Sequence, residues 1–388
     1  MKELDQDLGE ADGEEIFEFP PPERRIFTQP YDLSLQTLKE QWDQGELVVP
    51  EMQREYVWDI GRASRLIESL LLNIPVPPIY FAERPDSVLE VVDGHQRVGS
   101  IVSYLNNEFA LSGLGILSEY LRLRFHQLPE QEQRFLKSRS LRAVVIGRDS
   151  HPNMKFEVFE RLNTGGIALN AQELRNSLYR GSLNKMLRRL AKECKPFRAV
   201  IGGSKPRKRM VDEELILRWL AFRDKLKAYR PPLKRFLNEY MDENKERGEA
   251  WLSTRENHFR GTMQLIETVL GDQAFRLIDE TGEALLDEDG KPLPRGVNRA
   301  LFDAQATAFG WTSANSISDK QRVKLVQEIS KGLKREDLQD AARRATGDRA
   351  RIRLRVRTMV EALRASGLKV EVPSGIDLQE DVGGTAST

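Results

Sequence analysis

The sequence lacks the residues of several common kinds of site. Its one cysteine, Cys194, excludes an intrachain disulfide and a cysteine-based zinc cluster within one chain. The four histidines lie far apart, without the spacing of metal ligands. The chain also has no G-x-x-x-x-G-K-[ST] phosphate loop, no H-E-x-x-H, no G-x-S-x-G and no dinucleotide fingerprint. We therefore expect none of the enzyme classes that depend on these motifs.

Long apolar runs are missing as well. No run approaches the ~18 apolar residues needed to cross a bilayer, and the acidic start of the chain does not resemble a signal peptide. With 39% hydrophobic and 31% charged residues, the composition is that of a globular protein. We expect a cytoplasmic protein without a membrane segment, and 388 residues favour two packed units plus tails.

The formal net charge is zero, but the charges are unevenly distributed. Residues 1–23 carry −8 and residues 371–388 carry −4, so residues 24–370 carry about +12. A positive field of this size attracts phosphates. Two interpretations stay open: a nucleic-acid surface for which the acidic tails compete, or merely an unevenly charged soluble surface.

Strands and helices alternate up to about residue 180. Apolar periodicity predicts helices at 33–47, 61–73, 95–106, 153–163 and 169–180, and strands at 78–83, 88–93 and 141–147. Asn170 and Glu173 have the spacing of a capping box. Long polar helices follow, with a hairpin candidate at 276–295. The expected organisation is an acidic disordered tail (1–25), a mixed domain (26–181), a mainly helical domain (182–370) and a disordered acidic tail (371–388).

Three polar segments next to turn signals are candidates for a site: "PEMQREYVWD", "VVDGHQR" and "FERLNTGGIALNAQELRN". In the second, a buried strand turns at Gly94 into a helix whose first N–H groups favour phosphate. Arg97 is a candidate bidentate phosphate ligand, and Gln96 a hydrogen-bonding partner for a base, a phosphate or an attacking water. Asp93 is a candidate to hold a magnesium ion or to orient a water.

A structural interpretation of the same turn competes with this one. Asp93 and Gln96 also have the spacing of a capping box, in which both side chains only satisfy helix-end N–H groups. His95 is either a general base near neutral pH or an exposed first-turn residue, and we favour the second.

The other two segments allow similar pairs of interpretations. Gln53 and Arg54 offer donors held against a core, whereas Tyr56 and Trp58 are more typical of core aromatics than of base-stacking platforms. The "NTGG" loop is either a helix C-cap or an anion-binding nest.

Two basic stretches are candidates for contact with DNA. "KPRKR" (205–209) is a solvated loop or a phosphate contact, and in 343–357 the apolar spacing leaves arginines for the outer face of a helix. The candidate DNA-binding residues are Arg351, Arg353, Arg355, Arg357, Arg207, Lys208 and Arg209.

In this order, the three polar segments resemble the DGQQR-type, ParB-like N-terminal domain of GmrS, one half of the GmrSD restriction enzymes that cut modified phage DNA. The resemblance covers roughly residues 30–190. It places the family's QR pair on Gln53 and Arg54, its DGQQR motif on Asp93, Gly94, Gln96 and Arg97, and its asparagine–glycine loop on Asn163, Gly165 and Gly166. His95 departs from the motif, because the family usually has glutamine there.

The resemblance implies an α+β fold like that of ParB and sulfiredoxin, a small mixed sheet with helices, followed here by a mainly helical domain. It implies binding of an NTP, either ATP or GTP, with Mg²⁺ as its companion, and hydrolysis coupled to restriction of modified phage DNA. Many members continue into an HNH nuclease, but His258 is the only histidine after residue 191. We therefore expect a separate HNH-type nuclease subunit to cut the DNA, and count a homo-oligomer among the expected assemblies.

The leading hypothesis is an NTPase or NTP-sensing subunit of such a defence system. Its catalytic residues would be Asp93, Gln96 and Arg97, and its nucleotide-binding residues Gln53, Arg54, Gly94, His95, Asn163, Gly165 and Gly166. The alternative is a non-enzymatic, ParB-like DNA-binding or adaptor protein. A third option is an antitoxin-like regulator.

Overall fold

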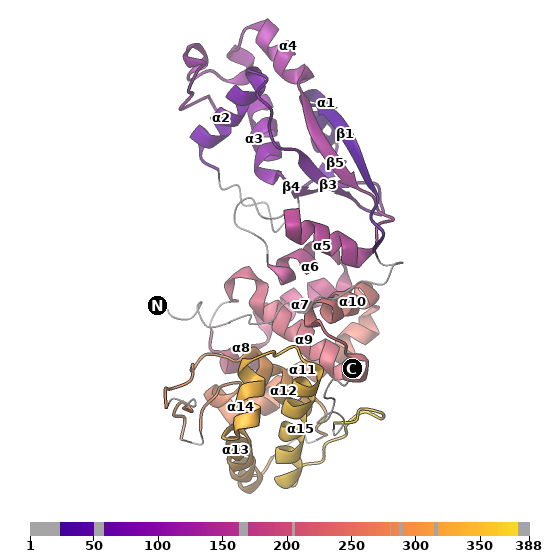
Figure 1. Ribbon diagram of the computed structural model, residues 1–388, viewed down its shortest axis with the longest axis vertical. Coiled ribbons are helices and arrows are strands. Elements are labelled where there is room, and N and C mark those ends of the chain that lie inside the picture. The colour runs from indigo at the N-terminus through magenta and orange to yellow at the C-terminus, as the bar shows by residue number, and fades with distance from the viewer. Residues whose placement is uncertain are drawn as a thin grey trace, which may run out of the picture. The chain divides into compact units, whose positions relative to one another are not determined.

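The computed structural model describes residues 24–49, 58–162, 170–203, 206–279, 281–286, 290–313 and 317–378. Its internal contacts divide the chain into a unit that ends at Leu178 and a unit that begins at Tyr179. We call them the sheet unit and the helical unit (Figure 1). The predicted fold class, a small mixed sheet with helices followed by a mainly helical region, is confirmed.

The sheet unit follows the predicted alternation of strands and helices. Its main elements in chain order are β1 (Thr28–Ser34), α1 (Leu35–Asp43), β2 (Leu47–Val48), α2 (Ile60–Leu71), β3 (Ile79–Glu83), β4 (Leu89–Asp93), α3 (His95–Leu105), α4 (Glu130–Ser138), β5 (Ser140–Ile146), α5 (Pro152–Leu162) and α6 (Ala171–Leu178). The sequence did not indicate β1 or α4. β1 is mostly exposed and has little apolar alternation, so its extended state depends on pairing with β5.

The strands lie in the order β1, β5, β3, β4, β2. β1 pairs with β5 and β3 with β4 in antiparallel orientation, whereas β5 pairs with β3 and β4 with β2 in parallel. β4 is therefore an inner strand, and its last residue, Asp93, lies opposite Tyr80 of β3. β2 pairs with the first residues of β4, Leu89 and Glu90, whereas β3 pairs with β4 as far as Asp93, where the chain leads into α3.

One face of the sheet carries the core of this unit, together with α1, α2, α3 and α4. The strand residues that point into it are Ile79, Phe81, Val91, Leu141, Ala143 and Val145. α3 contributes Val98, Ile101, Val102 and Leu105, the helical face that the sequence predicted. Val98 and Ile101 are fully buried, and burial of such a side chain contributes roughly 1.5–3 kcal/mol. The core thus fixes the direction in which the first turn of α3 points.

Two further helices belong to the sheet unit. α5 packs against β4, and Ser177 Oγ on α6 donates a 3.2 Å hydrogen bond to Glu90 Oε1 on β4. α6 begins at the predicted capping box: Glu173 N donates to Asn170 Oδ1 at 2.9 Å, and Asn170 N donates to Glu173 Oε2 at 2.7 Å. The helix start is therefore satisfied by neighbours in the sequence.

The helical unit contains the long polar helices that the sequence predicted. Its α-helices are α7 (Ser182–Glu193), α8 (Lys195–Ile201), α9 (Val211–Lys225), α10 (Leu233–Asn244), α11 (Glu249–Leu270), α12 (Arg299–Gly310), α13 (Asp319–Leu333), α14 (Glu336–Arg343) and α15 (Arg349–Ala365). In the hairpin candidate at 276–295, antiparallel bridges join Ile278 to Ala284 and Leu286 to Pro292. A strand-like connection therefore does interrupt the helices.

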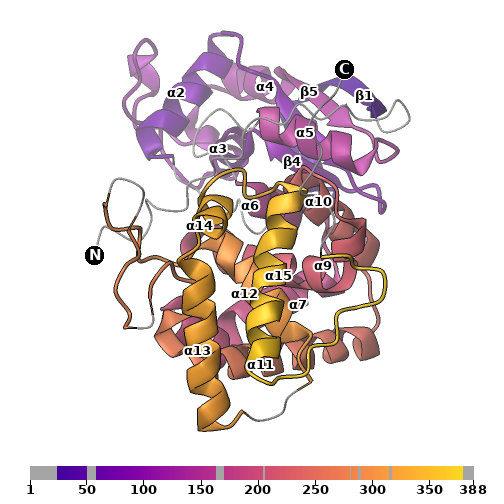
Figure 2. The ribbon, with the colours of Figure 1, turned by 60° about the horizontal axis from the view of Figure 1, so that its bottom comes forward.

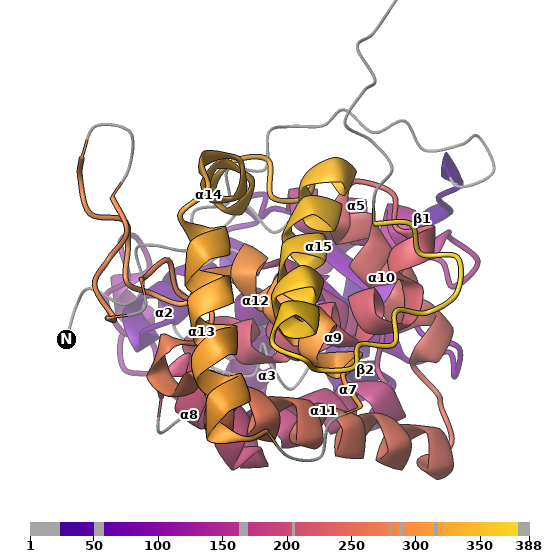
Figure 3. The same cartoon turned by 90° about the horizontal axis from the view of Figure 1, so that it is seen from below.

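α12 forms the centre of the helical unit. Every residue from 300 to 309 is buried, and α12 contacts α9, α11, α14 and α15. Figures 2 and 3 show α12 inward of α15. On its α9 side, Arg218 donates two hydrogen bonds to the Asp303 carboxylate, at 2.8 and 2.6 Å, and Trp219 Nε1 donates to the Ala306 carbonyl at 2.9 Å. Buried polar groups are thus paired across the central helix.

Candidate functional site

The turn between β4 and α3 has an unusual backbone at Gly94. Its φ is +97°, in the left-handed region that favours glycine. A Cβ at this position would lie 2.9 Å from Arg97 Nη2 and 3.0 Å from Ile79 Cγ1, closer than real Cβ contacts. Gly94 therefore serves two purposes: it makes the sharp turn, and it leaves room for the Arg97 guanidinium directly above the turn.

The Arg97 guanidinium is held by two acceptors. Its Nη2 donates to Asp93 Oδ2 at 2.7 Å and to the Pro78 carbonyl at 3.2 Å. The side chain is 13% exposed, and its Nε is buried with no hydrogen-bond partner among the described residues. A buried donor without an acceptor is uncommon in native proteins. The guanidinium is consequently fixed in place through Nη2, with its buried Nε donor unused.

The capping-box interpretation of this turn is wrong. The N-cap of α3 is Gly94, which has no side chain and cannot cap the helix itself. Asp93 forms an ion pair with Arg97 one turn later, and Gln96 Oε1 accepts a 3.1 Å hydrogen bond from the Trp58 N–H. Both side chains that the box would require are thus engaged elsewhere, and the charge of Asp93 lies next to the positive end of the α3 dipole.

Gln96 and His95 form a pair whose hydrogen positions can be assigned. Because Trp58 donates to Gln96 Oε1, the amide nitrogen of Gln96 must be the atom that faces His95 Nε2, at 2.9 Å. The amide nitrogen is a donor only, so His95 Nε2 accepts and carries no proton. We assign neutral His95 with its proton on Nδ1.

The surroundings of His95 agree with this assignment. Burial lowers the pKa of His95 below its ordinary value; the Asp93 carboxylate opposes the shift and the Arg97 guanidinium adds to it. His95 is half-buried, so the expectation of an exposed first-turn residue is wrong. Protonation would remove the acceptor that Gln96 uses, which couples the charge of His95 to the anchoring of Trp58.

Several predicted site residues lie outside the described residues: Gln53, Arg54, Asn163, Gly165 and Gly166. Tyr56 lies outside them too, but Trp58 is described and packs against the core of the sheet unit, as predicted for a core aromatic. The Arg62 guanidinium lies 4.7 Å from the centre of the Trp58 ring. Sequence reasoning missed the backbone partners at this site, the Pro78 carbonyl and the Trp58 N–H, because no side-chain pattern marks them.

The prediction of an outer arginine face on α15 is wrong for two residues. Arg353 is 5% exposed and Arg355 is fully buried. Arg355 donates to the carbonyls of Ala341 and Thr346, and burial lowers its pKa to about 10, so it stays charged at neutral pH. These arginines hold α15 in the helical unit, and they are not available to DNA in this structure.

The remaining candidate arginines, Arg207, Arg209, Arg351 and Arg357, are at least partly accessible. Arg351 pairs with Asp340, and Arg357 lies 4.0 Å from Glu361. Arg207 donates Nη2 to the Ile201 carbonyl at 2.6 Å, and Arg209 is exposed. The side chain of Lys208 lies outside the described residues. A DNA-binding role for this group stays a prediction.

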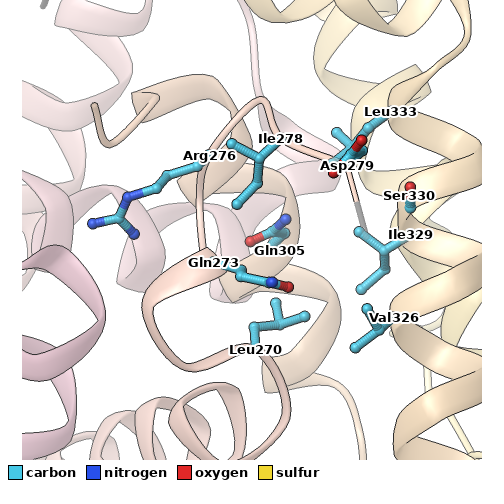
Figure 4. A pocket seen from close by; sticks show the side chains of 10 residues that line it. All are labelled: Leu270, Gln273, Arg276, Ile278, Asp279, Gln305, Val326, Ile329, Ser330 and Leu333. Carbon is cyan, nitrogen blue, oxygen red and sulfur yellow. The ribbon is translucent and has the colours of Figure 1, made fainter. Parts of the chain in front are cut away.

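A small cavity lies in the helical unit between α11, α12 and α13. Its lining includes Leu270, Gln305 and Ile329, and its volume is about 20 Å³. In Figure 4 the Arg276 guanidinium extends away from the other side chains, where it donates to the Val200 and Ala274 carbonyls. A cavity of this size holds about one water molecule, so it is too small for a base or a phosphate.

The described residues offer neither a metal-binding cluster nor a membrane helix. They contain no group of three or more His, Cys, Asp or Glu residues placed to hold a metal ion. None of the described helices combines the length and apolarity needed to cross a membrane.

Comparison with known proteins identifies a family that one part of the chain resembles. No match was found among curated proteins. Residues 35–180 match the family model described as the GmrSD restriction endonuclease, N-terminal domain. The match spans α1 to α6 and includes the β4–α3 turn with its Asp93, Gly94 and Arg97. This part of the chain is therefore similar to the N-terminal domain of the GmrSD restriction endonuclease.

Proposed function

We propose that this chain is the nucleotide-binding subunit of a GmrSD-like, modification-dependent restriction system. It would bind an NTP at the β4–α3 turn, hydrolyse it, and act on modified phage DNA together with a separate HNH-type nuclease subunit. The match of residues 35–180 to the GmrSD N-terminal domain supports the restriction context. The observation that carries the nucleotide site is the guanidinium of Arg97, fixed over a glycine turn at the start of α3.

The residues at this turn fit a phosphate group in two respects. The missing Cβ of Gly94 lets the Arg97 guanidinium lie against the turn, with Nη2 and Nε at 2.9 and 3.2 Å from the position that a Cβ would occupy. The N-cap glycine has no side chain that would cover the start of α3, and the N-terminal end of a helix favours an anion. Arg97 would then contribute a positive charge whose direction is already set, which reduces the entropy lost on binding.

Asp93 has a double role in this proposal. Its carboxylate positions the guanidinium, since Asp93 Oδ2 accepts from Arg97 Nη2. It is also the acid at the turn that a nucleotide-bound Mg²⁺ would meet, and Mg²⁺ commonly uses one or two carboxylates together with phosphates and waters. When bound, that ion would neutralise charge on the phosphates. Neutral His95 keeps the site free of an added positive charge and holds Gln96 in place.

Nucleotide binding and phosphate release test the proposal. With ATP and with GTP, each with Mg²⁺, we expect Arg97→Lys to weaken binding by roughly tenfold or more, because lysine keeps the charge but loses the planar fork. Asp93→Asn should also weaken binding, because it releases the guanidinium. Gln96→Ala should lower phosphate release, if Gln96 orients the attacking water.

The matched control is Arg134→Lys on α4, where the arginine side chain is 73% exposed. It should leave binding and the melting temperature unchanged. Absence of nucleotide binding by the wild type, or an equal loss of melting temperature and binding in Arg97→Lys, would contradict the proposal and favour the adaptor hypothesis. Binding without phosphate release would restrict the function to nucleotide sensing.

A further inference from the structure

A second surface of the sheet unit has the opposite chemistry to the phosphate site. A hollow of about 760 Å³ lies beside β1, the β3–β4 turn and the C-terminal end of α1. Four carboxylates line it, those of Glu46, Glu83, Asp86 and Asp149, and no lysine or arginine is among its lining residues. This hollow is therefore a separate, acidic surface, unsuited to a nucleotide.

Most of these carboxylates are not neutralised within the protein. Asp86 pairs with Arg84 at 2.9 Å, but Glu46, Glu83 and Asp149 form no ion pair with any residue that the structure describes. Glu83 Oε2 accepts only the backbone N–H of Arg148, at 3.3 Å. Three unpaired charges of one sign around a hollow create a local negative field that attracts cations.

Aromatic and amide groups complete the lining. The Phe27 and Tyr31 side chains are 53% and 41% exposed, which is unusual for rings on a sheet. Tyr31 lies opposite the buried Ala143 of β5, so both point to the same face of the sheet. Carboxylates and ring faces both recognise an ammonium or guanidinium group.

We propose that this hollow docks a flexible, lysine- or arginine-rich segment of a partner protein. A single metal ion does not account for the hollow, because no three carboxylates in the described chain are close enough to share one. Four carboxylates and two partly exposed rings in one hollow match the repeated cationic side chains of an extended segment. The inference stands on residues other than those of the proposed nucleotide site, so either can fail alone.

The test uses the full chain and a fluorescein-labelled heptapeptide of alternating arginine and threonine, measured by fluorescence anisotropy at low salt. The variant Glu46→Gln/Asp149→Asn removes two unpaired charges without breaking an ion pair. We expect it to weaken peptide binding by roughly fivefold. Tyr31→Thr, which keeps the β propensity, should weaken binding by about threefold.

The control variant Glu130→Gln/Glu132→Gln removes the same net charge from α4, outside the hollow. It should change the affinity by less than about twofold. Equal losses in the control and in the hollow variant, or equal binding of an alternating glutamate–threonine peptide, would overturn the proposal. Spermine binding at least as tightly as the peptide would also overturn it, because the hollow would then recognise a small polyamine and not a protein segment.

Discussion

At the scale of single residues, the role of Gly94 depends on contacts as well as on backbone freedom. Gly94→Ala introduces both a left-handed alanine and a clash with Arg97 and Ile79. We expect the free energy of unfolding to fall by roughly 2–4 kcal/mol. Gly45→Ala is the matched control, since Gly45 has φ +73° but nothing within 4 Å of an added Cβ. It should cost only about 1 kcal/mol. Equal costs in urea unfolding would show that Gly94 has no packing role.

His95 makes folding stability depend on pH near neutrality. Because its pKa is lowered in the folded protein, the unfolded chain takes up a proton first as the pH falls below about 6.5. The stability of the folded protein that depends on neutral His95 is therefore complete above that pH, and it is lost as the pH falls toward the pKa of His95 in the folded state. We expect the urea midpoint to drop between pH 7.5 and 5.5 by more in the wild type than in His95→Gln. Other groups titrate in both proteins and cancel. Identical drops would contradict the neutral, buried assignment.

At the scale of elements, α15 carries arginines with opposite roles. Arg355 is fully buried and satisfies two carbonyls, whereas Arg364 in the last turn is exposed. Arg355→Met leaves both carbonyls without their donor, and we expect a loss of about 2–4 kcal/mol in the free energy of unfolding. Arg364→Met should stay within about 0.5 kcal/mol. Urea unfolding at constant m-value measures both, and a loss below 1 kcal/mol for Arg355→Met would contradict the anchoring role.

At the scale of the whole molecule, charge separates the tails from the body. A shortened protein of residues 24–378 carries about +10, because it lacks residues 1–23 and the last part, 379–388, of the acidic tail at 371–388. If the tails compete with DNA for the body, the shortened protein should bind duplex DNA roughly tenfold more tightly at low salt, and the difference should shrink as salt rises. An electrophoretic or anisotropy titration over a range of salt concentrations measures this. Unchanged affinity at low salt would reject competition by the tails.

Because the chain divides into two units, each variant tests the unit in which its substitution lies. The proposed nucleotide site and the acidic hollow both lie within the sheet unit, and the buried arginines lie within the helical unit. A variant in one unit should therefore leave the core contacts of the other unchanged. This allows the loss of a ligand to be separated from the loss of a fold.

The sequence by itself determined the features that neighbouring residues control. The strand–turn–helix from β4 to α3, the buried face of α3 and the capping box of Asn170 and Glu173 all depend on spacings of four residues or fewer. Periodicity and local hydrogen bonds encode such features directly. The order of three polar motifs also sufficed to predict the family.

Only the tertiary structure decided how the charged side chains are used. Spacing allowed Asp93 to cap α3, but the fold places Arg97 over Gly94, where it takes the carboxylate instead. A run of arginines predicted an exposed face, yet Arg355 is buried because carbonyls from the α14 region need its donors. β1 and the acidic hollow depend on strands far apart in the chain. Burial and ion pairing are set by groups distant in sequence, and no local pattern contains them.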